Sequence, residues 1–214
     1  MIVERIMTKD VFTLTPEHTL QDANQLMREK KIRHLPIVNT QKQLVGLVAQ
    51  RDIKNTITHL LNQDEEKKIL QTPISEIMTR HPLVGHPLDF VEEVALLFYE
   101  HKIGCLPIIS HKKLVGILTD SDLLYNYIEL TGATKPSSRI DIRIKDEAGI
   151  LHEITGVIAQ YNANILSILL HPDISPNHQV ISIRVKSMNP VPIIRALRKE
   201  GFDVLWPNTL GMDL

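Results

Sequence analysis

Residues 103–122, IGCLPIISHKKLVGILTDSD, are a near-repeat of residues 32–52, IRHLPIVNTQKQLVGLVAQRD. Both stretches contain Leu-Pro-Ile, a polar turn, and a Leu-Val-Gly segment that leads to an Asp. A third landmark, Ile-Met-Thr, begins at Ile6 and again at Ile77, and matching positions lie 70 or 71 residues apart throughout. One structural unit is therefore duplicated, and two copies alone predict a closed pair rather than an open solenoid. The cleft between two related halves is a natural place for a ligand.

Composition limits the class of protein. The chain has 214 residues, enough for one to three compact units. Its 24 Lys and Arg residues against 25 Asp and Glu leave no basic excess, so we expect no nucleic-acid partner. The single Cys leaves no disulfide framework and is typical of a reducing cytoplasm. We see neither a signal-peptide pattern nor an apolar run of ~20 residues, and therefore predict a cytoplasmic protein without a membrane partner.

Hydrophobic periodicity predicts the same β-α-β-β-α order in both copies. In the first copy, residues 1–61, we predict a strand at 12–14, a helix from Leu20 capped by Thr19, strands at 32–38 and 44–49, and a helix over 52–61. In the second copy, residues 72–132, we predict a strand at 83–84, a helix around 91–98, strands at 103–109 and 114–118, and a helix from Asp122. The charged run at 62–68 between them indicates a solvated helix end or a linker.

A third unit follows a stretch rich in Gly, Pro and Ser at residues 131–138. Ile140, Ile142 and Ile144 alternate with polar residues, which predicts a half-buried strand. We predict a helix over 150–158, strands at 164–170 and 180–185, a helix from Pro190 to Gly201 and a strand at 202–206. The resulting β-α-β-β-α-β order is that of a ferredoxin-like unit over residues 138–214, and the whole chain is predicted to be α+β.

The stretch from Gly116 to Asp122 carries the clearest binding chemistry, because it is a strand followed by polar residues at the start of a helix. Helix N-termini attract phosphate. The Thr119 hydroxyl can donate to a phosphate oxygen, and the Asp122 carboxylate can accept from ribose hydroxyls. The alternative is that Thr119 or Asp120 only caps the helix. The matching Asp52 in the first copy favours binding.

With these landmarks in one order and present twice, residues 1–132 resemble a tandem pair of CBS domains, also called a Bateman module. The resemblance implies binding of AMP, ADP or ATP, or of S-adenosylmethionine, between the two halves. It implies that Thr119 and Asp122 hold phosphate and ribose. The residues implied to surround the adenine are Thr79, Val84, Ile103 and Gly104. The matching residues in the first copy are Thr8, Thr13, Ile32, Arg33 and Asp52.

The first copy departs from this pattern at Ala49, which stands where a hydroxyl residue belongs. Since a hydrogen bond contributes roughly 0.5–1.5 kcal/mol, and more to a charged group, we expect the first-copy site to bind more weakly. Arg51 is either a compensating phosphate-directed cation or a solvated surface residue.

Residues 138–214 resemble an ACT domain, through Asp146-x-x-Gly149-x-Leu151 at the first strand-to-helix turn and Asn164 at the second strand. ACT domains often bind amino acids at a dimer interface beside that turn. The resemblance implies that helix N–H groups take a carboxylate and that Asp146 or Asn164 takes an ammonium. The alternative is a turn that holds two dimerising subunits without a ligand.

Catalytic chemistry is not indicated. The ten His residues form neither H-x-x-x-H nor H-E-x-x-H pairs, and Cys105 lies beside an apolar strand as a core thiol would. Asp120 and Asp122 have no partner base in the sequence nearby. We therefore predict no catalytic residue, no metal and no catalytic cofactor. An enzyme would need a nucleophile–base pair, and a purely structural protein would use the CBS pair as an empty dimerisation scaffold.

A CBS pair followed by one ACT domain is similar to the acetoin-utilisation proteins of bacilli, which are linked to the catabolism of acetoin or butanediol. The resemblance implies a non-catalytic sensor that regulates an unidentified metabolic enzyme. We also expect a homodimer, because two-fold closed assemblies are the commonest among identical subunits and the exposed edge of the C-terminal sheet needs protection.

Overall fold

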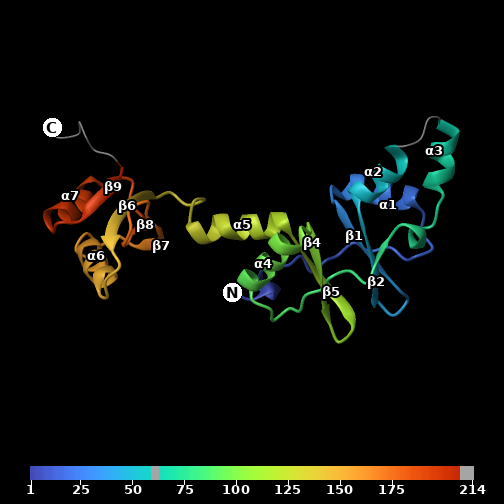
Figure 1. The fold of residues 1–214 in the computed structure, drawn as a ribbon, viewed down its shortest axis with the longest axis horizontal. Helices are drawn as coiled ribbons and strands as arrows, with labels where there is room; N and C mark the ends of the chain where they lie inside the picture. The colour runs from blue at the N-terminus through green and yellow to red at the C-terminus, as the bar shows by residue number, and fades with distance from the viewer. Residues whose placement is uncertain (59–62, 208–214) are drawn as a thin grey trace. The chain divides into compact units, whose positions relative to one another are not determined.

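A computed structural model of the protein describes residues 1–58 and 63–207. The chain divides into two compact units, Met1–Leu124 and Tyr125–Leu214 (Figure 1). The predicted end of the first copy at Leu61 and the predicted C-terminal limit at residue 214 lie outside the described residues.

The first unit contains two antiparallel hairpins, each followed by a helix. One sheet has the order β1-β2-β3 and the other consists of β4 and β5. The elements are η1 (Val3–Arg5), α1 (Leu20–Lys30), β1 (His34–Val38), β2 (Leu44–Ala49), α2 (Gln50–Thr58), α3 (Gln63–Leu70), η2 (Ile74–Glu76), β3 (Thr79–Arg80), α4 (Val91–His101), β4 (Cys105–Ser110), β5 (Lys113–Thr119) and α5 (Asp120–Thr131). The duplicated α-β-β-α order is confirmed, and the last helix, α5, continues into the second unit.

Two short predicted strands are wrong. Leu14 forms a single bridge with Ile37, and Gly85 forms one with Ile108, so neither segment is a strand. Both segments are too short, and too closely flanked by proline, to sustain a ladder of hydrogen bonds. The charged run is not an open linker, because α3 occupies Gln63–Leu70. Glu, Lys and Leu are strong helix formers, and the end of α3 packs against the first core.

The beginning of each copy packs into the core of the other copy. Ile74 and Ile77 belong to the core built on α1, β1 and β2, whereas Val3 and Ile6 belong to the core built on α4, β4 and β5. Backbone hydrogen bonds hold both exchanged segments in place. The Ile74 N–H donates to the carbonyl of His18 at 2.8 Å, and the Val3 N–H donates to the carbonyl of Asp89 at 2.9 Å. The two copies therefore complete one another.

This exchange explains why the landmarks recur together. A Cβ atom at Gly116 would lie 2.5 Å from Met7 Sδ and 3.1 Å from the Thr8 carbonyl oxygen. A Cβ atom at Gly46 would collide with the Met78 side chain in the same way. The Leu-Val-Gly glycine of one copy thus leaves room for the Ile-Met-Thr methionine of the other.

Helix α1 begins as the sequence predicts. The Thr19 N–H donates to the Asp22 carboxylate at 2.8 Å, and the Asp22 N–H donates to the Thr19 hydroxyl at 3.2 Å. This reciprocal pair is a capping box, which satisfies two N–H groups that the first turn of a helix leaves without partners.

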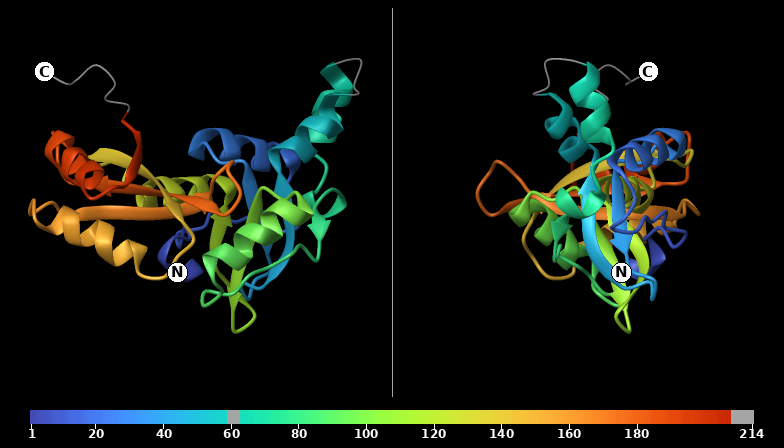
Figure 2. Two further views of the ribbon diagram at one scale, coloured as in Figure 1. Left: turned by 60° about the vertical axis from the view of Figure 1, so that its left-hand side comes forward. Right: turned by 90° about the vertical axis from the view of Figure 1, so that its right-hand side faces the viewer.

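The second unit has the predicted β-α-β-β-α-β order (Figures 1 and 2). Its antiparallel sheet has the strand order β7-β8-β6-β9. The elements are β6 (Ser138–Lys145), α6 (Ile150–Ala159), β7 (Ile165–Pro172), β8 (His178–Val185), α7 (Val191–Lys199) and β9 (Asp203–Trp206). Ile140, Ile142 and Ile144 are buried in one core with residues of α6 and α7, as their alternation predicts.

Candidate functional site

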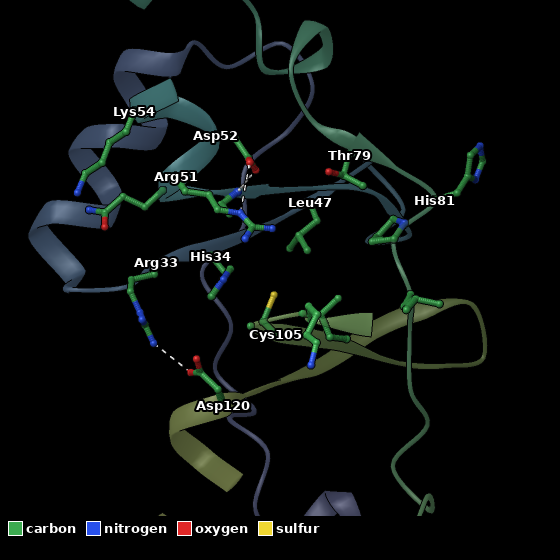
Figure 3. Close-up of a pocket in the computed structure, with 17 residues that line it drawn as sticks. Arg33, His34, Leu47, Arg51, Asp52, Lys54, Thr79, His81, Cys105 and Asp120 are labelled. Carbon is green, nitrogen blue, oxygen red and sulfur yellow. Dashed lines mark hydrogen bonds and ion pairs between the residues drawn. The ribbon is translucent and has the colours of Figure 1, made fainter. Parts of the chain in front are cut away.

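The larger cleft of the first unit, which we call the Asp52 cleft, has a volume of about 690 Å³. Its lining combines the β2–α2 junction of the first copy with the β3 and α4–β4 segments of the second copy (Figure 3). The lining residues include Arg33, His34, Ala49, Arg51, Asp52, Lys54, Thr79, His81, Leu83, Lys102, Ile103, Gly104, Cys105 and Asp120.

The smaller cleft, which we call the Asp122 cleft, has a volume of about 280 Å³ and the complementary construction. It combines the β5–α5 junction of the second copy with segments that precede α1 and β1 in the first copy. Its lining residues are Thr8, Asp10, Val11, Phe12, Lys31, Ile32, Arg33, His34, Ile117, Thr119, Ser121 and Asp122.

The structure corrects the grouping of the sequence-predicted residues by copy. Asp122 shares a cleft with Thr8 and Ile32 of the first copy. Asp52 shares one with Thr79 and Ile103 of the second copy. The exchange of initial segments brings the beginning of one copy to the end of the other, so each cleft draws on both.

Two predicted residues, Thr13 and Val84, line neither cleft, whereas their neighbours do. Phe12, rather than Thr13, lines the Asp122 cleft, and its counterpart Leu83, rather than Val84, lines the Asp52 cleft. Thr13 lines a separate hollow of about 400 Å³. Asp10, Val11 and Phe12 all line the Asp122 cleft, so this irregular segment does not follow the alternation of a strand.

Thr119 and Asp122 cap α5 through each other. The Thr119 hydroxyl donates to Asp122 Oδ2 at 2.7 Å, the Thr119 N–H donates to the same oxygen at 2.8 Å, and the Asp122 N–H donates to the hydroxyl at 3.3 Å. A hydroxyl has one proton to donate. In this arrangement the proton goes to Asp122, so Thr119 is a cap residue and reaches a phosphate only by exchanging that bond.

The β2–α2 junction of the first copy has the backbone bond of this cap but lacks the hydroxyl bond. The Ala49 N–H donates to Asp52 Oδ2 at 2.9 Å, without a hydroxyl to add a second bond. Arg51 Nε lies 3.9 Å from Asp52 Oδ1, and the Arg51 side chain is 79% exposed. Figure 3 shows Arg51 beside Asp52 at the cleft. Arg51 is solvated and also lines the cleft, so a role toward phosphate stays a prediction.

Arg33 and His34 line both clefts. Arg33 Nη2 lies 3.0 Å from Asp120 Oδ1, which links the two copies (Figure 3). The same Nη2 lies 3.4 Å from the Ser121 hydroxyl oxygen. Burial lowers the pKa of His34, and the positive charge of Arg33 lowers it further. The imidazole is therefore neutral at pH 7.

Cys105 is a buried free cysteine that lines the Asp52 cleft. The residue is 4% exposed, and burial raises the pKa of its thiol to about 12, with the carboxylates of Asp120 and Asp52 adding to the rise. Because the thiolate is the reactive form, this thiol is inert at neutral pH, as a core position predicts.

The residues predicted for the ACT domain lie at opposite ends of its sheet. Asp146 follows Lys145, which pairs with His178, and the turn continues through Gly149 to the exposed Leu151 of α6. Asn164 accepts a hydrogen bond from the Lys186 N–H, beyond the opposite end of β8. It lines a hollow of about 440 Å³. A single chain does not bring Asn164 to the Asp146 turn.

Within residues 1–58 and 63–207, every helix is too short or too polar to cross a membrane.

Comparisons with known proteins agree with this architecture. A family model for the CBS domain matches residues 3–59 and 74–129, and one for the ACT domain matches residues 138–202. The chain is 31% identical over 129 residues, 60% of its length, to a homoserine O-acetyltransferase of Methanococcus vannielii, and spans 25% of that enzyme.

Among solved structures, a Vibrio cholerae protein assigned to acetoin utilization (AcuB) is 38% identical, with a TM-score of 0.55. The aligned region covers 64% of this chain and 98% of the Vibrio cholerae chain. CBSX2 in complex with AMP is 29% identical, with a TM-score of 0.52 and coverages of 59% and 96%. The CBS domain pair of MJ0100, in complex with 5′-methylthioadenosine and S-adenosylmethionine, is 26% identical, with a TM-score of 0.53 and coverages of 63% and 98%. The matched domains, the two clefts that each draw on both copies, and these relationships together show that the chain belongs to the CBS-domain family, as a tandem CBS pair followed by an ACT domain.

Proposed function

We propose that this protein is a non-catalytic, ligand-sensing regulatory protein whose CBS pair binds AMP, ADP or ATP, with S-adenosylmethionine as the alternative ligand. The observation that carries the proposal is the matched construction of the two clefts. Each has an Asp in the first turn of a helix, with a Thr and an Ile supplied by the other copy. A carboxylate accepts from ribose hydroxyls, apolar side chains contact a base, and a helix N-terminus favours phosphate.

The related structures support the same ligand chemistry. CBSX2 was solved with AMP, and the MJ0100 pair with 5′-methylthioadenosine and S-adenosylmethionine. All three molecules contain adenosine, so the shared part of the ligand is the base with its ribose. CBS and ACT domains are regulatory modules, which supports a sensor without chemistry of its own.

Isothermal titration calorimetry of the full chain with AMP, ADP, ATP and S-adenosylmethionine tests this proposal. We expect micromolar to millimolar dissociation constants for at least one of them and unequal affinities at the two clefts. GMP is the matched control for recognition of the base. Absence of heat with all four adenosine ligands would contradict the sensor and leave a ligand-free dimerisation scaffold.

The role in acetoin or butanediol catabolism is the finer part of the proposal, and the similarity to the Vibrio cholerae protein supports it. A metabolic enzyme would be the regulated partner. A strain that lacks the gene should grow more slowly on acetoin or butanediol than on glucose, relative to its parent. Equal relative growth on all three carbon sources would count against this role.

A homodimer is the proposed assembly. Leu96 and Tyr99 on α4 are 54% and 72% exposed, and β7 is an edge strand that carries the exposed Leu170. Light scattering at micromolar concentration should give the mass of two chains, and a monomer would contradict the assembly.

A further inference from the structure

We infer that the two clefts select different adenosine ligands. The Asp52 cleft selects a ligand that carries a polyphosphate chain, and the Asp122 cleft selects a ligand that lacks one. This inference rests on the proposed function and deepens it. It derives from residues at which the two copies differ, since those differences set the charge of two clefts that otherwise share one construction.

Three differences between matching positions make the Asp52 cleft more positive. Arg51 of α2 corresponds to Ser121 of α5, and each lines its own cleft. Lys54, on the next turn of α2, corresponds to the uncharged Leu124. His81 lines the Asp52 cleft, whereas its counterpart Asp10 places a carboxylate in the Asp122 cleft.

The positions that do not differ serve as an internal reference. Lys102 and Lys31 correspond, and each lines one cleft. Asp52 and Asp122 also correspond. The unequal charge therefore comes from the helices α2 and α5 and from the segments that contain His81 and Asp10.

The sum of charges differs accordingly. The Asp52 cleft has three cationic side chains, Arg33, Arg51 and Lys102, against the two carboxylates of Asp52 and Asp120. Lys54 also lines this cleft but already makes an interaction of its own within the chain. The Asp122 cleft has two cations, Lys31 and Arg33, against the two carboxylates of Asp10 and Asp122. A chain of several phosphates is attracted by each added cation and repelled by each carboxylate. Added phosphates should therefore increase the affinity of a ligand only at the Asp52 cleft.

The sizes and linings of the two clefts support the same assignment of ligands. The Asp52 cleft, at about 690 Å³, is more than twice as large as the Asp122 cleft, at about 280 Å³. The Asp122 cleft instead has the Phe12 ring, 44% exposed, where the other copy has Leu83, and Lys30 Nζ lies 5.1 Å from the centroid of that ring. An aromatic ring stacks on a base without regard to phosphate. This cleft therefore suits a small ligand that is held through its base.

Ile32 and Ile103 are matched reporters, because they correspond in sequence and each lines one cleft. In methyl NMR titrations of the full chain, with both signals assigned through Ile32→Val and Ile103→Val, we compare adenosine, AMP and ATP. At Ile103 we expect ATP to bind at least about tenfold more tightly than adenosine. At Ile32 we expect ATP to bind no more tightly than adenosine. Equal ratios at both reporters would overturn the inference.

Exchange of the differing residues tests the cause. Arg51→Ser should weaken ATP binding at Ile103 by about three- to tenfold while changing adenosine binding less than about twofold. Ser121→Arg should strengthen ATP binding at Ile32 by a similar factor. Arg28→Ser on α1, which removes the same charge from a position that lines neither cleft, is the control.

The outcomes distinguish failure of the proposed function from failure of the inference. If no adenosine ligand shifts either reporter, the proposed function fails and this inference fails with it. If adenosine and ATP bind but Arg51→Ser and Arg28→Ser have the same effect, the proposed function stands and the assignment of the polyphosphate to the Asp52 cleft is wrong.

Discussion

Arg33 Nη2 lies 3.0 Å from Asp120 Oδ1, and this ion pair joins the residue before β1 in the first copy to the first residue of α5 in the second. Both side chains are about half exposed, at 57% and 51%, so the pair itself adds little to stability. The ion pair matters because of its position, since Arg33 lines both clefts.

Asp120→Asn should therefore strengthen ATP binding without a large change in folding. The substitution releases Arg33 and removes a negative charge from the Asp52 cleft. We expect ATP to bind about two- to fivefold more tightly, and the free energy of unfolding to change by less than about 1 kcal/mol. Calorimetry and urea unfolding measure the two quantities. Weaker ATP binding would show that Asp120 serves the ligand directly.

Asp122→Ala should lower both stability and affinity. The loss of the capping box costs about 0.5–2 kcal/mol of unfolding free energy, and the loss of a ribose acceptor costs about 1–3 kcal/mol of binding. Asp122→Asn retains an acceptor for the Thr119 N–H and should recover most of the stability. If Asp122→Ala left adenosine affinity unchanged, Asp122 would be a cap residue alone.

Gly116→Ala should destabilise the CBS pair by about 1–3 kcal/mol, because a Cβ atom would collide with Met7 and approach the Thr8 carbonyl. Gly156 in α6 provides the control, since a Cβ atom there meets no atom within 4 Å. Gly156→Ala should keep or increase stability by about 0.5–1 kcal/mol. Urea unfolding of both variants measures the difference, and equal stabilities would refute this account of the glycine.

Acid should destabilise the protein in part through His34. Its pKa is lowered in the folded state, so the unfolded chain takes up the proton first, near pH 6.5. The contribution of the neutral imidazole is complete above that pH and is lost as the pH falls below it. Between pH 7.5 and 5.5, His34→Gln should reduce the slope of unfolding free energy against pH. An unchanged slope would assign the acid sensitivity to other groups.

Cys105 should resist alkylation. With a thiol pKa of about 12 and 4% exposure, it should react with iodoacetamide at pH 8 far more slowly in the folded chain than in urea. The chain has one Cys, so the rate of labelling reports this position alone. Fast labelling of the folded protein would contradict the buried placement.

The duplicated architecture was predictable because it depends on local patterns. Thr19 and Asp22 form the expected cap, and the alternation of Ile140, Ile142 and Ile144 gives the expected buried face. These features depend on neighbours within a few residues, where periodicity and capping rules apply.

The composition of each cleft was not predictable in the same way. The partner of Asp122 is Thr8, more than a hundred residues away, and their proximity results from the exchange of segments between the copies. The choice of Phe12 over Thr13 depends on which face of an irregular segment points inward. The glycines were the available signal, since an Ile-Met-Thr and a Leu-Val-Gly in each copy suggest contact partners.

The exchange of initial segments has a consequence for the origin of the chain. A protein with one copy would leave the places of Ile74 or Val3 in its core unfilled. It would complete itself only by trading that segment with another molecule, as a domain-swapped dimer of identical halves does. Such an ancestor would hold two identical clefts, and a change in one would always appear in the other. Fusion of the halves into one polypeptide removes that constraint, so Arg51 and Ser121 are free to differ, and one gene encodes two clefts with different linings.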